Sequence, residues 1–255
     1  MCLMLLALDV VPDRPWLLLG NRDEFHSRPS APAQEWSDAA GVFGGRDLQA
    51  GGSWLAVQRS GRYAAVTNVR QGGPATAPHS RGILVRDFVT GNAGVTPYAN
   101  AVASARSGYG PFNLLVGDAS SACFVSSIDG AVRPLRPGVH AFSNGSLDDQ
   151  WPKMRRLHDN FFILLQNGGV EDTALLDLLG DAALPAHGDL PDTGIDADLE
   201  RRLASIFVAP MRIRGEAYGT RASTLAYSRG GRGMILHERR FGADGHVLAE
   251  SRIGF

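Results

Sequence analysis

Cys2 is the residue whose position says most about chemistry. The initiator methionine is usually removed when the second residue is small, and removal here would leave a thiol and a free α-amine on one residue. A terminal amine has a pKa of roughly 7.7–8.0 and a free thiol one of about 8.5, so the amine can accept the thiol proton near neutral pH. Nucleophile and base would then share a single residue. The alternative is a packed thiol at the start of a strand, which is commoner for an arbitrary cysteine.

A run of polar residues from Asn21 to Glu24 follows the apolar segment 16–19. If that segment forms a hairpin with the first apolar segment, the run returns to the level of Cys2. Asp23 could then orient the ammonium group, and Arg22 could lower the thiol pKa or bind a substrate carboxylate. On spacing alone, a solvated turn with an internal ion pair explains the same residues equally well.

Three later residues are further candidates for the same site. Asn68 ends a predicted strand and Asn144 precedes a glycine and a predicted helix. An amide side chain can donate a hydrogen bond to a developing oxyanion without titrating, although a single asparagine is more often a turn former. Arg221 lies at the start of a predicted C-terminal strand, where the alternative is an exposed edge arginine.

Short apolar runs separated by turns predict that most of the chain is β-structure. Residues 3–10 and 16–19 predict an opening hairpin buried on both faces, and residues 53–58 and 63–67 predict a second hairpin. Further strands are expected at 112–116, 123–127, 223–227, 233–240 and 247–252. Cys123 lies within one of these runs and is expected to be structural.

Helical periodicity is clearest at residues 151–165, where Met154, Leu157, Phe161 and Leu165 recur at helical spacing. Helices are also expected at 81–90, 97–106, 171–180 and 196–206, and a mobile loop at 184–194. Strands followed by helices and then strands indicate an α+β fold with an antiparallel sheet core. No boundary divides the chain, so we expect one domain over residues 1–255.

Composition excludes several classes of function. The net charge of −1 over 255 residues provides no basic field for nucleic acid. Two cysteines do not make a disulfide framework, and the apolar N-terminus meets Asp9 too early for a membrane span or signal peptide. We therefore expect a cytoplasmic protein. The seven histidines lack metal-ligand spacing and no nucleotide-binding motif is present, so we expect no metal and no cofactor.

Taken together, these blocks resemble the NRDE family, also called the transport and Golgi organisation protein 2 family. The resemblance covers residues 1 to about 227. It is carried by Met-Cys at the start, Asn21-Arg22-Asp23-Glu24, Arg28-Pro29, Thr67-Asn68, Ser143-Asn144-Gly145 with Trp151, and Gly219-Thr220-Arg221.

That family is similar to N-terminal-nucleophile (Ntn) hydrolases such as choloylglycine hydrolases and penicillin V acylases. The resemblance implies a four-layer αββα sandwich of two antiparallel sheets between helices. It also implies that Cys2 is the nucleophile, Arg22 and Asp23 its supporting pair, Asn68 and Asn144 the oxyanion and amine partners, and Arg221 a late arginine of the site. The amidases space their Arg and Asp more widely than the adjacent pair here.

Two functions follow from the resemblance. The first is hydrolysis of a small acylated amide through a thioester on Cys2. The second is non-enzymatic binding and trafficking of haem or an acyl lipid, since eukaryotic members of the family are associated with haem movement and lipid metabolism. The first function implies a small amide or acyl ligand, and the second adds haem as a ligand. Both stay open because a shared fold alone does not fix the function.

Overall fold

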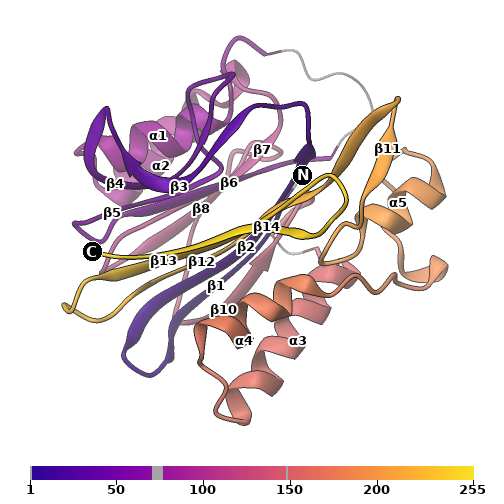
Figure 1. Ribbon diagram of the computed structural model, residues 1–255. Helices are drawn as coiled ribbons and strands as arrows, with labels where there is room; N and C mark the ends of the chain where they lie inside the picture. The colour runs from indigo at the N-terminus through magenta and orange to yellow at the C-terminus, as the bar shows by residue number, and fades with distance from the viewer. Residues whose placement is uncertain (1, 71–76, 148) are drawn as a thin grey trace.

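The computed structural model describes residues 2–70, 77–147 and 149–255, and within them two antiparallel sheets stack face to face (Figure 1). Helices cover the outer face of each sheet, so the order of layers is helix, sheet, sheet, helix. This is the expected four-layer αββα sandwich.

The first sheet holds the N-terminal strand as an inner strand, one position from its edge. Its strand order is β10-β1-β2-β12-β13-β14, with β11 paired to β12. The strands are β1 (Cys2–Val11), β2 (Arg14–Phe25), β10 (Gly138–Phe142), β11 (Met211–Ile213), β12 (Glu216–Ser228), β13 (Met234–Phe241) and β14 (Val247–Gly254). Because β1 has β10 on one side and β2 on the other, the start of the chain is held inside the sheet.

The second sheet follows chain order, β3-β4-β5-β6-β7-β8-β9, as successive antiparallel strands. Its strands are β3 (Ser30–Trp36), β4 (Ala39–Asp47), β5 (Leu55–Gln58), β6 (Tyr63–Asn68), β7 (Phe112–Gly117), β8 (Ala122–Ser126) and β9 (Val132–Pro134).

The helices divide between the two outer faces (Figure 1). Helices α1 (Gly82–Thr90) and α2 (Val95–Ser104) pack on the second sheet through residues such as Phe88 and Val102. Helices α3 (Pro152–Gln166) and α4 (Asp172–Asp177) pack on the first sheet through residues such as Leu157 and Leu175. Helix α5 (Ala197–Leu203) lies near β11, and short 3₁₀ turns occur at Arg106–Gly108, Leu178–Gly180 and His187–Asp189.

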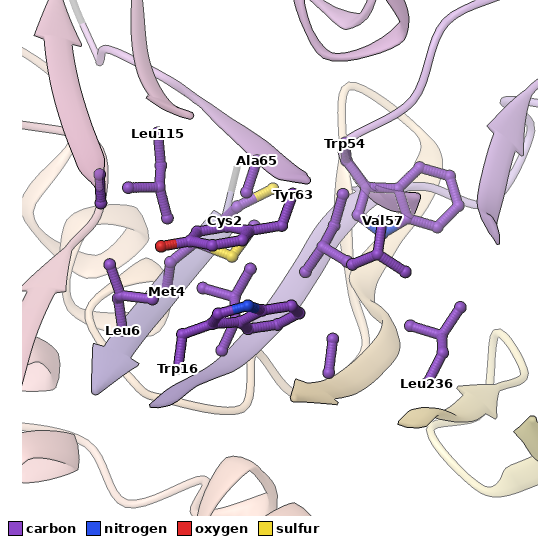
Figure 2. Close-up of a cluster of buried hydrophobic side chains, with 14 of the residues drawn as sticks. Cys2, Met4, Leu6, Trp16, Trp54, Val57, Tyr63, Ala65, Leu115 and Leu236 are labelled. Carbon is purple, nitrogen blue, oxygen red and sulfur yellow. The ribbon is translucent and has the colours of Figure 1, made fainter. Parts of the chain in front are cut away.

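Alternation along β1 explains how one strand serves two cores. Successive side chains of a strand point to opposite faces. Cys2, Met4 and Leu6 join the cluster between the sheets, whereas Leu3 and Leu5 join the cluster under α3 and α4. Figure 2 shows the cluster between the sheets, in which these β1 side chains meet residues of the opposite sheet.

The polar run is part of a strand rather than of the segment that follows one. We expected Asn21–Glu24 to follow the second strand, but β2 continues through Phe25. The reason is its second partner, because β12 pairs with β2 from Tyr227↔Leu17 to Tyr218↔Phe25. Likewise Arg221, expected at the start of a strand, lies in the middle of β12 at a bulge between Thr220 and Ala222.

The remaining differences concern elements that lack a clear apolar pattern. Strands β3, β4, β9, β10 and β11 were not predicted. The helices predicted at 171–180 and 196–206 are shorter, ending as α helices at Asp177 and Leu203. The predicted loop at 184–194 contains only a 3₁₀ turn, and Arg201 Nε donates a hydrogen bond of 2.9 Å to the carbonyl of Pro185 in it.

No helix in the described part of the chain combines the length and the apolarity needed to cross a bilayer.

Candidate functional site

Cys2 lies where β1 begins, at one end of the sandwich. It pairs with Arg22 on β2, as the predicted hairpin requires. On the other side, the hydroxyl of Ser143 donates a 2.8 Å hydrogen bond to the Cys2 carbonyl. The residue is 7% exposed and lines a cavity of about 110 Å³. The other residues that line this cavity are Arg22, Asp23, Glu24, Arg28, Asp47, Ser53, Trp54, Val66, Asn68, Ser80, Arg81 and Gly82.

The thiol itself is held in its protonated form by its surroundings. Burial raises the pKa of the Cys2 thiol, while the positive charge of Arg22 and the backbone N–H of Asp23 act in the opposite direction. Burial favours the neutral form because a thiolate loses its hydration there. A nucleophilic Cys2 therefore needs a base close by.

Arg22 and Asp23 are adjacent in sequence but serve opposite faces of the first sheet. Arg22 points between the sheets, with its guanidinium 4.3 Å from the centre of the Trp54 ring and Nη1 3.4 Å from the Ser30 hydroxyl. The Asp23 carboxylate accepts a 2.7 Å hydrogen bond from Thr220 Oγ1. The predicted supporting pair is thus divided between two layers.

Asp23 lies one residue beyond the Cys2–Arg22 pair, on the side of Cys2 where its backbone nitrogen lies. Burial raises the pKa of the Asp23 carboxyl, whereas nearby Lys153, the Thr220 hydroxyl and Arg70 act to lower it. Burial is the largest of these effects, so the pKa of the Asp23 carboxyl is raised overall.

Asn68 and Asn144 are brought together, but with unequal access to the cavity. Asn68, at the end of β6, lines it. Asn144 is fully buried behind, and its Nδ2 donates a 2.8 Å hydrogen bond to the carbonyl of Asn68. Its Oδ1 accepts hydrogen bonds from the Ser143 hydroxyl at 3.1 Å and from Lys153 Nζ at 3.2 Å. Asn144 therefore fixes the backbone of Asn68, using one of the two hydrogens of its amide nitrogen.

Arg221 does not line the Cys2 cavity. Its Nη1 donates hydrogen bonds to the carbonyls of Phe25 and Arg28. It lines a neighbouring cavity of about 220 Å³, which shares Arg22 and Trp54 with the Cys2 cavity. Four of the five other predicted residues therefore lie around Cys2, and the fifth, Arg221, lines the adjoining cavity.

Lys153 is a residue of this region that sequence reasoning did not assign to it. It is the only lysine of the chain and is 1% exposed in the first turn of α3. Nζ donates to Asn144 Oδ1 and, at 3.1 Å, to the carbonyl of Leu203. Burial, together with the positive charge of Arg70, lowers the pKa of Lys153 to about 7. One feature of the sequence does indicate that Lys153 is buried: it comes four residues before Leu157, which places it on the apolar face of the predicted helix.

The far wall of the cavity comes from the β4–β5 connection and the start of α1, neither of which was predicted as part of the site. Arg28 forms an ion pair with Asp47 across this wall, with 2.6 Å between Nη2 and Oδ2. The Ser53 backbone N–H donates a 3.0 Å hydrogen bond to the carbonyl of Gly82, which joins the connection to the helix.

In the described ranges, no group of three or more His, Cys, Asp or Glu side chains is arranged to hold a metal ion.

Comparison with solved structures defines the class of fold. A crystal structure of a mutant conjugated bile acid hydrolase from Clostridium perfringens superposes with a TM-score of 0.61, covering 100% of this chain and 92% of the other at 9% identity. The fold is that of the Ntn hydrolases.

Comparison of sequences gives the family. Residues 1–243 match the model of the family described as Transport and Golgi organisation 2. The human and bovine Transport and Golgi organization protein 2 homologs are each 30% identical to the chain, and each alignment covers 92% of the chain and 85% of the relative. The chain belongs to the Transport and Golgi organisation 2 family.

Proposed function

We propose that the protein is an amidohydrolase that uses Cys2, exposed by removal of the initiator methionine, as its nucleophile on a small acylated amide. The observation that carries this proposal is the place of Cys2. It begins an inner strand of the first sheet, lines a cavity, and pairs with Arg22, the neighbour of the buried Asp23.

The proposed reaction begins with proton transfer within one residue. The α-amine of Cys2 accepts the thiol proton, and the thiolate attacks the amide carbonyl of the substrate. The ammonium then protonates the leaving nitrogen, the C–N bond breaks, and an acyl thioester stays on Cys2. Water hydrolyses the thioester, which releases the acid and restores the thiol. The Asp23 carboxylate, fixed by Thr220, orients the ammonium group.

The oxyanion of each tetrahedral intermediate needs a donor aimed into the cavity. Asn68 supplies the amide on the cavity wall, and Asn144 fixes the backbone that carries it. Arg22 adds positive charge beside the thiol, and its effect on the Cys2 pKa has the sign required to favour the thiolate.

The competing proposal is a non-enzymatic carrier of haem or an acyl lipid. The family description, with its reference to transport, supports it. The geometry favours the hydrolase, because the Cys2 cavity of about 110 Å³ is small beside the 300–1,000 Å³ typical of sites that enclose a drug-sized ligand. Titration with haemin and with an acyl-CoA tests the carrier, which predicts binding tighter than that of an unrelated protein.

Turnover of a panel of fluorogenic acyl amides tests the hydrolase. We expect the wild-type protein to release the amine and to form an acyl adduct that mass spectrometry maps to Cys2. Cys2→Ala should abolish both. Cys123→Ala is the matched control, because this second buried thiol belongs to the core of the other sheet and should not affect turnover. Undiminished turnover by the Cys2→Ala variant would refute the proposal.

A further inference from the structure

The cavity of about 220 Å³ beside the Cys2 cavity is called the lobe below, and its floor consists of Arg22, Ala222 and Arg240 on three neighbouring strands. Ala222 on β12 pairs with Arg22 of β2 on one side and with Arg240 of β13 on the other. Residues paired across an antiparallel sheet point to the same face, and strands lie about 4.8 Å apart. The two arginines therefore rise on either side of a small alanine, with roughly 10 Å between their backbones. Both line the cavity of about 220 Å³.

A third arginine reaches the same lobe because of the bulge in β12. Arg221 occupies the register shift between Thr220 and Ala222. A bulge redirects the side chain of the extra residue. Arg221 lines the lobe, and its buried Nε has no hydrogen-bond partner within the described residues. The same is true of Nε2 of His26, another lining residue.

The positive charge of the lobe is only partly offset by the protein. No ion pair found among the described residues includes Arg22, Arg221 or Arg240. The acid on the lining, Glu238, accepts a 2.8 Å hydrogen bond from the backbone N–H of Ala33. Burial raises the pKa of its carboxyl, although Arg240 and Arg22 act to lower it.

The arginines also influence their neighbours. Burial and Arg22 lower the pKa of Arg221, Glu24 acts to raise it, and Arg240 acts to lower it. Burial, Arg221 and Arg22 lower the pKa of His26, whereas Asp244 acts to raise it. An anion bound between the arginines would relieve the repulsion between their like charges.

We propose that this lobe binds an anionic group, a carboxylate or a phosphate, between Arg22 and Arg240 above Ala222. Arginine pairs suit both groups, because the guanidinium donates two parallel hydrogen bonds to their oxygens. Trp54 and Leu248 supply an apolar wall, so the preferred ligand joins the anion to a hydrocarbon part.

The lobe also narrows the substrate class of the hydrolase, and this extension rests on the proposed function. Arg22 and Trp54 line both cavities, so one ligand can place its anionic end in the lobe and its amide beside Cys2. The substrate is then an acyl amide that carries a carboxylate or a phosphate. Binding of the anion itself does not require a reactive thiol.

Calorimetric titration with hexanoate, hexyl phosphate and hexanol tests the lobe. We expect at least one anion to bind at least tenfold more tightly than hexanol, and the tighter anion distinguishes a carboxylate from a phosphate ligand. Arg240→Gln should weaken anion binding about tenfold or more, because it removes charged hydrogen bonds. Ala222→Val, which fills the floor without changing charge, should weaken it too.

Two controls separate this proposal from others. Arg202→Gln removes the same charge from an exposed position on α5 and should leave binding unchanged. Cys2→Ala should also retain anion binding, so that loss of turnover and loss of the lobe can be told apart. The proposal is overturned if neither anion binds, if hexanol binds equally well, or if Arg240→Gln, with an unchanged melting curve, keeps wild-type affinity.

Discussion

At the scale of single residues, Lys153 is the most unusual group near the site. Fully buried lysines are rare, and this one is held by the side chain of Asn144 and the carbonyl of Leu203. The charged groups that influence it are Arg70, which lowers its pKa, and Asp23 and Cys2, which raise it. The protonation of Lys153 is therefore coupled to the charges of Asp23 and of the Cys2 thiol.

The lowered pKa of Lys153 predicts a pH-dependent contribution to stability. Above about pH 7 the folded protein holds Lys153 neutral, whereas the unfolded chain keeps the proton up to its usual value of 10.5. The unfolded state binds more protons in this window, so stability relative to Lys153→Met should rise with pH, by at most about 1.4 kcal/mol per unit. Urea unfolding of both proteins at pH 7 and pH 9 measures this difference. If the free energies of unfolding of the two proteins differ by the same amount at pH 7 and at pH 9, the lowered pKa of Lys153 is contradicted.

We predict that Asn68 stabilises the oxyanion directly, whereas Asn144 acts by holding Asn68 in place. Asn68→Ala should lower kcat about 10²-fold or more with little change in KM, as loss of an oxyanion donor does. Asn144→Ala should in addition lower the free energy of unfolding by roughly 1–3 kcal/mol, because it leaves buried partners unsatisfied. Steady-state kinetics and urea unfolding separate the two. A normal kcat in the Asn68→Ala variant would show that Asn68 is not part of the mechanism.

At the scale of elements, the site depends on long strands whose sequences are not uniformly apolar. The Asn21–Glu24 run is polar, yet it continues β2 because β12 supplies a partner on its far side. That partner lies about 200 residues later in the chain, so local pattern could not show it. Pairing between β1 and β2, by contrast, is local. The sequence could therefore predict that Cys2 lies level with the run that contains Arg22.

The contact between the β4–β5 connection and the start of α1 should be sensitive to a single methyl group. A Cβ at Gly52 would lie 2.3 Å from the backbone carbon of Gly82. Gly52→Ala should therefore cost about 1–3 kcal/mol of stability, and should change the reactivity of Cys2 by moving the cavity wall. Gly188→Ala is the control, since a Cβ there meets nothing within 4 Å. Urea unfolding and thiol alkylation rates compare them, and equal behaviour of the two variants would contradict this packing.

At the scale of the whole molecule, the sequence was most informative where side-chain patterns are local. Residues 3–10 and the helix around Leu157 could be predicted from apolar periodicity, and the αββα layers followed from the family resemblance. The strands between Ser30 and Asp47 could not, since only Ala33, Trp36, Val42 and Phe43 supply buried apolar side chains across both of them.

Four of the residues that lie around Cys2 could be named from the sequence, but their arrangement could not. Residue types drew attention to Asp23 and Asn68, yet the division of Arg22 from Asp23 depends on the strand's alternation through a run expected to follow the strand. The bulge that turns Arg221 toward a separate lobe depends on pairing between β2 and β12, which no local pattern encodes.

The central claim is that the amine of Cys2 is free to act as the base for its own thiol. Intact mass of the purified protein, with mapping of the N-terminal peptide, measures this directly. The account predicts a species lighter by one methionine residue, with Cys2 as the first residue and as the position acylated by substrate. Full retention of Met1 in active protein, or acylation at Cys123 alone, would contradict it.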